Sequence, residues 1–319
     1  MRATVAISVG DLNGVGIAIA LEAHDAVSEI CRPLYCINRT MLERAAALLG
    51  RSVPEDFEIV DVPGDFSIRP GTVDAASGRY SYDSFMKGIE LCEKGEAAAV
   101  VTLPVHKEAW MKAGLAFKGH TDLLRRHFGA EAIMMLGCEQ LYVALFTEHM
   151  PLRSVPDAIE EEALTRFLLD FRKETQAERI AVLGLNPHAG DNGVLGDEER
   201  IIERAIANAN GALAPEREKR KEEKEVDVFH GPVVPDVAFT PAFRRNFRYM
   251  VAMYHDQGLA PLKALYFDES INVSLNLPIV RTSVDHGTAF DIAYRGTPRC
   301  DSYRNAVSAA LELALSRRK

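Results

Sequence analysis

Residues 180–190 read IAVLGLNPHAG, an apolar run that ends in a glycine- and proline-containing turn with a histidine at its centre. The pattern recurs at 141–151 (LYVALFTEHMP) and at 249–258 (YMVAMYHDQG), where a histidine again follows the apolar residues. Short apolar runs bounded by turn residues are typical of buried strands. Side chains at strand ends project into the crevice where open α/β sheets bind ligands. We therefore expect an α/β sheet with three histidines at its strand ends.

The rest of the chain alternates apolar runs with helical patterns, which predicts a mixed, mostly parallel sheet covered by helices. Strands are expected at 4–9, 33–37, 98–103, 180–185 and 249–254, with 141–147 and 271–277 alternating as antiparallel or edge strands. Helices are expected at 41–49, 80–94, 160–173, 198–210 and 301–316. The run of mixed charge at 216–225 is expected to be a solvated helix or loop.

Length and composition favour an enzyme-sized globular protein. The chain has 319 residues and 47% hydrophobic content, enough for one large or two medium α/β domains. Its net charge of −9 argues against general nucleic-acid binding, which favours basic surfaces. The N-terminal residues lack a signal-peptide pattern, and no apolar stretch reaches membrane-spanning length. We therefore expect a cytoplasmic protein with neither nucleic-acid nor membrane partners.

The three strand-end histidines, His149, His188 and His255, could together bind a divalent metal and leave one coordination position open. They lie far apart in the chain, so the fold would have to assemble the site. Asp256 follows His255 directly and could orient it as a hydrogen-bond acceptor. Each histidine alone is also compatible with a hydrogen-bonded structural role.

A second group of polar residues indicates a site for an anion. Lys263, Asn272 and Arg281 together would recognise a substrate with carboxylate and phosphate groups, because a guanidinium binds oxyanions bidentately. Arg281 leads into an expected loop of small polar residues, RTSVDHGT, that could wrap a phosphate or a dinucleotide. The alternative is a buried ion pair between Arg281 and Asp285.

Three shorter motifs could either bind an anionic ligand or serve only as structural turns. PVHK at 104–107 and GHTD at 119–122 could offer cationic and hydroxyl groups to an anion, or could be surface turns. The turn VGDLNGVG at 9–16 is either a phosphate-cradling loop or a tight βα turn that needs glycine, and Asp11 could face the crevice.

Five strings, PVHK, GHTD, GLNPHAG, MYHDQGLAPLK and RTSVDHGTA, occur between residues 104 and 289 in this order. Both the strings and their order resemble those of the 4-hydroxythreonine-4-phosphate dehydrogenase family of pyridoxal 5′-phosphate biosynthesis. The resemblance implies a two-lobed α/β/α fold like that of isocitrate and isopropylmalate dehydrogenases. It also implies a homodimer with the active site in a cleft at the dimer interface. We place one lobe at about 1–115 plus 265–319, and the second, with the metal ligands and dimer contacts, at 116–264.

The same resemblance assigns roles to residues. It implies that His149, His188 and His255 bind a divalent metal, either zinc, magnesium or cobalt. The substrate ligands that it implies are His120, Thr121, Lys263, Asn272 and Arg281. Lys263 and Asp256 are the candidate catalytic residues, and Lys263 is either a proton donor or a charge partner. NAD or NADP is the expected oxidant, with Asp285, His286 and Thr288 as candidate cofactor ligands.

The expected reaction follows from this combination of groups. A metal lowers the pKa of the substrate C3 hydroxyl, and a hydride passes to the nicotinamide. Oxidation of 4-phosphohydroxy-L-threonine would give 2-amino-3-oxo-4-phosphooxybutanoate, which loses CO₂ to yield 3-amino-2-oxopropyl phosphate. Alternatives are a paralogue that oxidises 4-phospho-threonate, 4-phospho-erythronate or a cis-diol, a metal-dependent phosphatase or hydrolase, and a non-catalytic metal-binding paralogue.

The chain departs from the family pattern at two places. The turn at 9–17 lacks the three prolines that are usual there, so it could be less stiff than in the family. Asp268, Glu269 and Ser270 stand where the family often has a glycine, and they add negative charge near the expected anion site. This loop could curve away from the site, or the substrate preference could differ.

Overall fold

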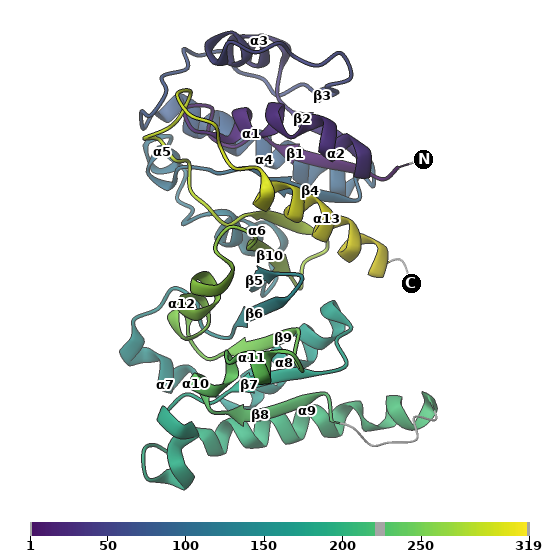
Figure 1. The fold of residues 1–319 in the computed structure, drawn as a ribbon, viewed down its shortest axis with the longest axis vertical. Helices are drawn as coiled ribbons and strands as arrows, with labels where there is room; N and C mark the ends of the chain where they lie inside the picture. The colour runs from purple at the N-terminus through teal and green to yellow at the C-terminus, as the bar shows by residue number, and fades with distance from the viewer. Residues whose placement is uncertain (1, 221–226, 318–319) are drawn as a thin grey trace. The chain divides into compact units, whose positions relative to one another are not determined.

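A computed structural model describes residues 2–220 and 227–317, which form two compact units (Figure 1). Unit 1 comprises Met1–Ala132 and Asp268–Lys319, and unit 2 comprises Ile133–Phe267. The expected boundary at residue 115 differs, because helix α6 (His120–Phe128) belongs to unit 1. The His120 ring packs against Phe85 and Trp110, and the carbonyl of Glu131 accepts a hydrogen bond from Asn276. These contacts hold the segment to unit 1.

The strands of unit 1 follow the order β3-β2-β1-β4-β11-β10. Their bounds are β1 Thr4–Ser8, β2 Arg32–Cys36, β3 Ile59–Val60, β4 Ala99–Thr102, β10 Ile271–Leu275 and β11 Arg281–Val284. All neighbouring pairs are parallel except β10 with β11, which is antiparallel. The expected strands at 4–9, 33–37, 98–103 and 271–277 thus correspond to observed strands with slightly different ends.

Strand β11 corrects the expectation of a polar loop that begins at Arg281. Residues 281–284 are all buried and pair with β4 on one side and β10 on the other. The hydroxyl of Thr282 donates a hydrogen bond of 2.7 Å to the carbonyl of Ala306. Strand pairing satisfies the backbone groups of these residues, and bonds such as that of Thr282 satisfy polar side chains that the sequence alone favours placing in a loop. The loop begins only after Val284.

Two helices of unit 1, α3 and α4, begin at side chains that cap them. Asn38 accepts a hydrogen bond from the Met41 amide at the start of α3, and Asp74 does the same for Ala76 in α4. Helix α4 packs on β1, β2 and β4, and α13 packs on β4, β10 and β11. The bounds are α1 Gly16–Glu22, α2 His24–Ile30, α3 Arg39–Leu49, α4 Ala75–Glu93, α5 Lys107–Lys112 and α13 Asp301–Ser316.

The strands of unit 2 follow the order β5-β6-β9-β7-β8. Their bounds are β5 Ile133–Cys138, β6 Leu141–Leu145, β7 Ile180–Leu183, β8 Phe229–Val233 and β9 Tyr249–Ala252. Strand β6 is antiparallel to β5 and parallel to β9, and β7 is parallel to both β9 and β8. Together the two units confirm the expected α/β class with mixed, mostly parallel sheets.

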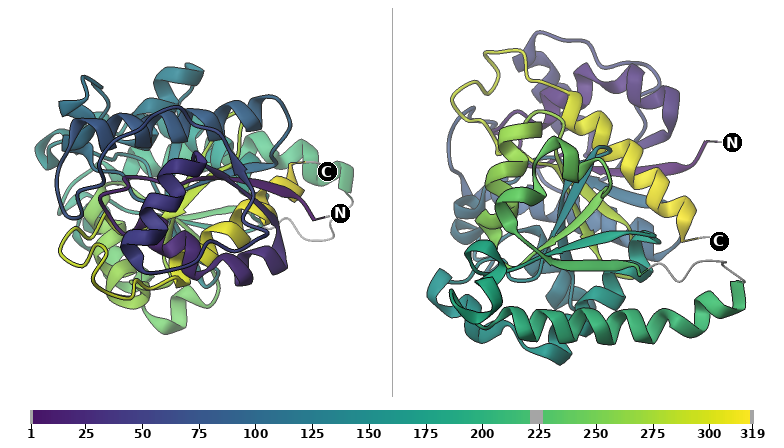
Figure 2. Two further views of the ribbon diagram at one scale, coloured as in Figure 1. Left: turned by 90° about the horizontal axis from the view of Figure 1, so that it is seen from above. Right: turned by 60° about the horizontal axis from the view of Figure 1, so that its bottom comes forward.

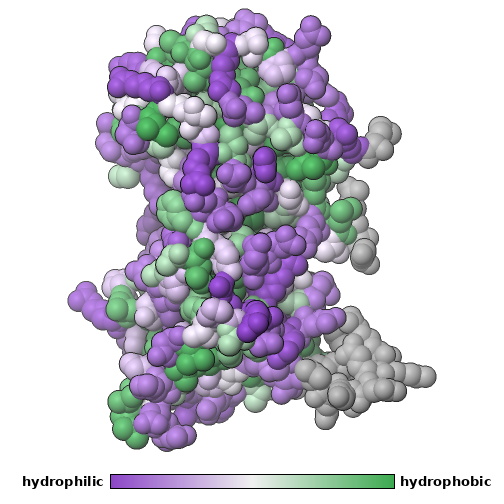
Figure 3. Space-filling model, viewed as in Figure 1, coloured by the Kyte–Doolittle hydropathy of each residue, from purple (hydrophilic) through white to green (hydrophobic). Residues whose placement is uncertain are grey.

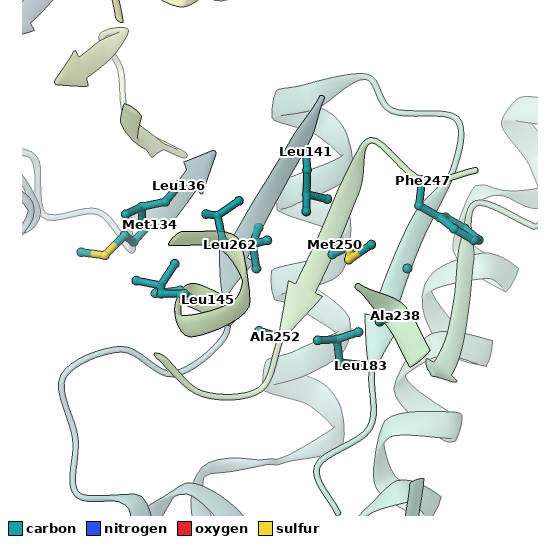
Figure 4. Close-up of a cluster of buried hydrophobic side chains, with 13 residues drawn as sticks. Met134, Leu136, Leu141, Leu145, Leu183, Ala238, Phe247, Met250, Ala252 and Leu262 are labelled. Carbon is teal, nitrogen blue, oxygen red and sulfur yellow. The ribbon is translucent and has the colours of Figure 1, made fainter. Parts of the chain in front are cut away.

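One face of the unit 2 strands carries a buried apolar cluster (Figure 4). Leu145, Leu183 and Met250 come from three different strands, and Leu262 comes from α12. Helix α9 runs beside β8 (Figure 2) and also packs against α8. The bounds are η1 Leu152–Ser154, α7 Val155–Ala158, α8 Glu161–Thr175, η2 Pro187–Gly193, α9 Glu199–Arg220, α10 Pro235–Ala238, α11 Pro241–Arg244 and α12 His255–Tyr266.

Two further expectations concern the surface. Helix α9 extends to Arg220, and residues 221–225 of the expected charged segment lie outside the described residues. Within the described ranges, none of the helices is long and apolar enough to cross a membrane. On the face shown in Figure 3, hydrophilic residues predominate and hydrophobic ones are scattered among them.

Candidate active site

Arg281 lies at the start of β11 and is only 2% exposed. Its Nη2 donates to the Thr102 hydroxyl at 2.8 Å, and its Nη1 donates to Ser274 at 3.2 Å and weakly to Asn272 at 3.4 Å. Its Nε has no hydrogen-bond partner among the described residues. Burial lowers the pKa of Arg281 to about 9, the opposite of what a neighbouring carboxylate would do. The lowered pKa of Arg281 therefore gives no support to the alternative considered from the sequence, a buried ion pair between Arg281 and Asp285.

His120 begins α6, directly after Gly119 with its positive φ of 146°. Its ring packs edge-on against Phe85, with centroids 4.8 Å apart, and against Trp110 at 5.7 Å. Burial, together with the positive charges of Arg281 and Lys107, holds the pKa of His120 well below its usual value. His120 is therefore neutral at pH 7, and its buried Nε2 has no hydrogen-bond partner in the described chain.

These side chains form what we call the cationic centre, defined as His120, Lys107 and Arg281. Thr121 follows His120 in the first turn of α6 and is 8% exposed. Two positive charges, an imidazole nitrogen and an arginine Nε that lack partners, and a hydroxyl provide donors for a tetrahedral oxyanion. The structure therefore brings together four of the expected substrate ligands, His120, Thr121, Asn272 and Arg281, in unit 1. The fifth, Lys263, lies on α12 in unit 2, with its Nζ 5.8 Å from the centroid of the Phe267 ring.

The acidic segment at 268–270 is bound to helix α13 and its preceding loop. The Asp268 carboxylate pairs with Arg299 at 2.6 Å. Ser302 donates to the carbonyl of Ser270 at 2.8 Å, and Asn305 donates to the carbonyl of Glu269 at 3.0 Å. The negative charge that Asp268 adds at this departure from the family pattern is thus offset by Arg299.

The candidate cofactor residues follow β11 in a loop that is fastened to the first turn of the chain. The carbonyl of Thr288 accepts a hydrogen bond of 3.1 Å from the Val15 amide. A Cβ at Gly14 would lie only 2.8 Å from that same carbonyl oxygen, so the close approach requires glycine. The Asp285 amide donates to Ser302 at 3.2 Å, and His286 Nδ1 bonds the Gly287 carbonyl at 3.0 Å.

Asn13, which the sequence reasoning did not single out, stiffens the turn at 9–17 without the usual prolines. Its side-chain oxygen accepts from the Arg69 amide and its amide nitrogen donates to the Thr72 carbonyl, both at 2.8 Å. Its own carbonyl accepts from Gly71, again at 2.8 Å. The turn is thereby bonded to residues 69–72, which are distant in sequence.

Asp11 in the same turn is completely buried. Its Oδ1 accepts hydrogen bonds from Ser77 and from the Asn13 amide, whereas its Oδ2 has no partner among the described residues. Burial raises the pKa of Asp11, and these two hydrogen bonds partly offset the shift.

The three strand-end histidines of unit 2 follow β6, β9 and β7, which are adjacent and parallel. Carboxyl ends of parallel strands meet at one edge of a sheet, so the three turns share an edge. The rings of His149 and His255 lie 5.6 Å apart between centroids. His255 Nδ1 bonds the Asp256 carboxylate at 2.8 Å, an arrangement that commonly orients metal-binding imidazoles. The Asp256 carboxylate thus contacts a ring nitrogen of its neighbour His255.

The spacing of the His149 and His255 rings is close to that of two imidazoles on one metal, whereas the full set of three is not assembled. Two imidazoles on one tetrahedral metal have ring centroids roughly 5 Å apart, given metal–nitrogen bonds of about 2.0–2.1 Å. Among the described residues, however, no three His, Cys, Asp or Glu side chains are grouped closely enough to hold a metal ion. His188 is therefore not grouped with the other two.

The segment that carries His188 has an unusual backbone conformation. Residues 188–192 all have positive φ values, from 44° at Asp191 to 76° at Gly190. Four of these five residues are not glycine, and each such residue costs roughly 1–3 kcal/mol unless its surroundings stabilise it. Contacts from neighbouring segments must therefore hold this turn in place.

Thr147 and Gln257 connect the three histidine-bearing turns through the backbone, and neither was singled out from the sequence. The Thr147 hydroxyl donates to the Met253 carbonyl at 2.7 Å. Gln257 accepts from the Met253 amide at 2.7 Å and donates to the Gly184 carbonyl at 2.6 Å. These bonds run from the His149 turn, through the start of α12, to the segment that precedes His188.

Residues 29–310 match the model of the family described as pyridoxal phosphate biosynthetic protein PdxA. The chain belongs to the PdxA family. A relative from Sulfurimonas denitrificans, named 4-hydroxythreonine-4-phosphate dehydrogenase, is 60% identical over 312 residues, which cover 98% of each chain. A crystal structure of 4-hydroxythreonine-4-phosphate dehydrogenase from Klebsiella pneumoniae aligns with a TM-score of 0.81 at 31% identity, over 98% of both chains.

A more distant structural relative shares the fold alone. A terephthalate 1,2-cis-dihydrodiol dehydrogenase from Burkholderia xenovorans aligns with a TM-score of 0.63 at 24% identity, over 99% of both chains. The PdxA family fold is thus also found in a dehydrogenase named for a different kind of alcohol. Within this fold, the cationic centre is the feature of this chain that points to a phosphorylated substrate.

Proposed function

We propose that this PdxA family protein oxidises 4-phosphohydroxy-L-threonine at C3 with NAD or NADP. The C3 hydroxyl loses a proton and its carbon transfers a hydride to the nicotinamide, which gives 2-amino-3-oxo-4-phosphooxybutanoate. Loss of CO₂ from this 3-keto acid leaves an enolate, which takes up a proton at the same carbon to give 3-amino-2-oxopropyl phosphate. The observation that carries the proposal is the cationic centre, in a chain 60% identical to a relative named for this activity.

In this proposal the cationic centre binds the phosphate. Arg281 offers its partnerless Nε, and His120 offers its Nε2 in the donor tautomer. The Thr121 hydroxyl and the Asn272 amide complete the set of neutral donors. A neutral His120 avoids adding a third charge to the centre, while the phosphate relieves the burial of the Arg281 charge. Lys263 is proposed as a further ligand and as a proton donor or relay, because its ammonium group can do either.

We propose His149, His255 and His188 as the metal ligands, with zinc, magnesium or cobalt as the ion; the structure places the rings of the first two side by side, and His188 is not grouped with them. A bound divalent ion would stabilise the developing alkoxide and the enolate formed on decarboxylation. Asp256 holds the His255 ring through its Nδ1, which leaves Nε2 as the ligand atom. Asp285, His286 and Thr288 are proposed to contact the dinucleotide, since Thr288 lies in a loop tied to the first βα turn. The homodimer and the cytoplasmic location expected from the sequence stay predictions, and light scattering would test the dimer.

The test is reduction of NAD or NADP, followed at 340 nm, with a panel of substrates in the presence of Zn²⁺, Mg²⁺ or Co²⁺. We expect turnover with 4-phosphohydroxy-L-threonine and little with the same compound lacking phosphate. Turnover of 4-phospho-threonate or 4-phospho-erythronate instead would assign a different substrate to the same site. Release of phosphate without a dinucleotide would indicate the hydrolase alternative.

Arg281→Met tests the assignment of the phosphate site. Loss of charge-assisted hydrogen bonds worth about 1.5–3 kcal/mol each should lower kcat/KM by roughly 100-fold or more. Arg304→Met is the matched control, because Arg304 lies on α13 with an exposed side chain. We expect it to stay within twofold of the wild type. Retention of full activity in Arg281→Met would contradict the phosphate assignment.

A further inference from the structure

Glu199 is the first residue of α9, yet its carboxylate contacts a distant loop rather than its own helix. The side chain is buried, with the residue only 5% exposed. Its Oε1 accepts two backbone hydrogen bonds, from Leu185 at 2.9 Å and from Asn186 at 2.7 Å. An acidic residue at a helix start ordinarily interacts with the amides of the same helix. Here the carboxylate instead binds the segment that leads into His188.

The second carboxylate oxygen engages the Asn186 side chain. The Asn186 Nδ2 donates to Glu199 Oε2 at 2.9 Å and to Glu198 Oε2 at 2.7 Å, so both hydrogens of the amide are used. Asn186 also lacks the freedom to flip, because a flipped amide would present its oxygen to two carboxylates. The two bonds set the orientation of Asn186, which precedes His188 by two residues.

Glycines allow the loop to close around this carboxylate. A Cβ at Gly190 would lie 2.6 Å from Glu199 Oε2, and one at Gly184 would lie 3.2 Å from Oε1. A Cβ at Gly196 would lie 2.2 Å from Asn186 Nδ2. The loop therefore touches Glu199 and Asn186 before His188, at Gly184, and after it, at Gly190 and Gly196. His188 lies between these contacts in the left-handed turn.

We propose that Glu199 is the positioning residue for His188. Its carboxylate holds, through Leu185 and Asn186, the loop whose left-handed turn carries this histidine. Gln257, bonded to the Gly184 carbonyl, holds the same loop from the helix that carries His255. The consequence for catalysis rests on the proposed function, in which His188 acts in the active site. The effect on the conformation of His188 does not depend on that function.

The variants are Glu199→Ala, Glu199→Gln and, as a matched control, Glu203→Gln. Glu203 lies one turn further along α9 and is exposed. The alanine variant removes both acceptors. The glutamine variant keeps an oxygen for the Leu185 and Asn186 amides but sets an NH₂ group against Asn186 Nδ2. We therefore expect the order wild type, Glu203→Gln, Glu199→Gln, Glu199→Ala, from least to most affected.

The first readout is independent of activity. NMR of ¹³Cε1-labelled histidine follows each ring, with His188 assigned from His188→Ala and His24 of unit 1 as an internal reference. Glu199→Ala should shift the His188 resonance and leave that of His24 unchanged, whereas Glu203→Gln should shift neither. A folded Glu199→Ala protein with an unchanged His188 resonance would overturn the proposal.

The second readout is a double-mutant cycle on kcat/KM. Glu199→Ala should lower kcat/KM by 10- to 100-fold in the wild type, as is typical for residues that orient a ligand side chain. In the His188→Ala background the same substitution should change kcat/KM by less than threefold. Equal losses in both backgrounds would show that Glu199 acts on general stability and would overturn the positioning role. If the wild type lacks dehydrogenase activity, the proposed function fails, and the histidine resonance alone decides the role of Glu199.

Discussion

Arg281→Met should abolish phosphate binding without making the free protein less stable. Arg281 is 2% exposed, and the acceptors of its guanidinium are neutral groups of Thr102, Ser274 and Asn272. A buried charge without a counter-charge destabilises the folded state, and replacing it with an apolar side chain of similar volume is often neutral or stabilising. Methionine is unbranched and flexible enough to follow much of the space that arginine occupies.

The size of the effect follows from the pKa. Burial lowers the pKa of Arg281 from 12.5 to about 9, and each pH unit corresponds to about 1.4 kcal/mol. Holding the charge in the free protein thus costs on the order of 5 kcal/mol. Hydrogen bonds to the three neutral acceptors offset about 0.5–1.5 kcal/mol each. The substitution should therefore change the free energy of unfolding by between about zero and about 3 kcal/mol in the stabilising direction.

Urea unfolding in a buffer without polyvalent anions measures this change directly. Addition of inorganic phosphate to about 100 times its dissociation constant should stabilise the wild type by about 2.7 kcal/mol, because the ligand binds only the folded state. The same addition should leave Arg281→Met unchanged and should act on Arg304→Met as on the wild type. A loss of more than about 2 kcal/mol for Arg281→Met without anions would refute the reasoning, because the guanidinium would then be a structural element.

Two further predictions concern buried polar groups. Because the pKa of His120 is lowered in the folded protein, the unfolded chain binds a proton that the folded protein does not, below a pH of about 6.5. Stability should therefore be full above that pH and fall between pH 6.5 and 5, less steeply in His120→Gln. Equal slopes in urea unfolding would argue against a neutral His120. Gln257→Leu leaves the Met253 amide and the Gly184 carbonyl without their partner, and should cost about 2–4 kcal/mol in the same assay. A loss below 0.5 kcal/mol would mean that water replaces the side chain.

Short-range patterns predicted the parts of the fold that depend on local sequence. Apolar runs followed by glycine or proline marked β1, β7 and β9 within a few residues of their observed ends. Helix α13 was predicted with its observed bounds, Asp301–Ser316. In each case the apolar face and the flanking turn lie within the same short window, so the signal is present in the sequence itself.

The elements that the sequence analysis missed depend on distant partners. The sequence of β11 is typical of a polar loop. Its residues Arg281, Thr282 and Ser283 become buried only through pairing with β4 and β10. The extent of unit 1 was underestimated for the same reason, since contacts of α6 with α4 and α5 are not visible in local periodicity. For the site, motif resemblance named His120 and Arg281, while Asn13, Gln257 and Glu199 act through hydrogen bonds that no short motif encodes.

The strand-end histidines illustrate where sequence reasoning ends and geometry begins. Adjacent parallel strands bring the turns of His149, His255 and His188 to one edge, as the repeated pattern predicts. Sharing an edge does not orient the rings. Thr147 and Gln257 connect the first two turns through Met253. The rings of His149 and His255 in these turns lie 5.6 Å apart between centroids. His188 depends on a different partner, the carboxylate of Glu199, which reaches the loop from the start of α9. Gln257 also reaches the His188 loop, through the Gly184 carbonyl, but the described hydrogen bonds of the Glu199 carboxylate all go to that loop. Substitutions at Glu199 should therefore disturb His188 and leave the pairing of His149 with His255 intact.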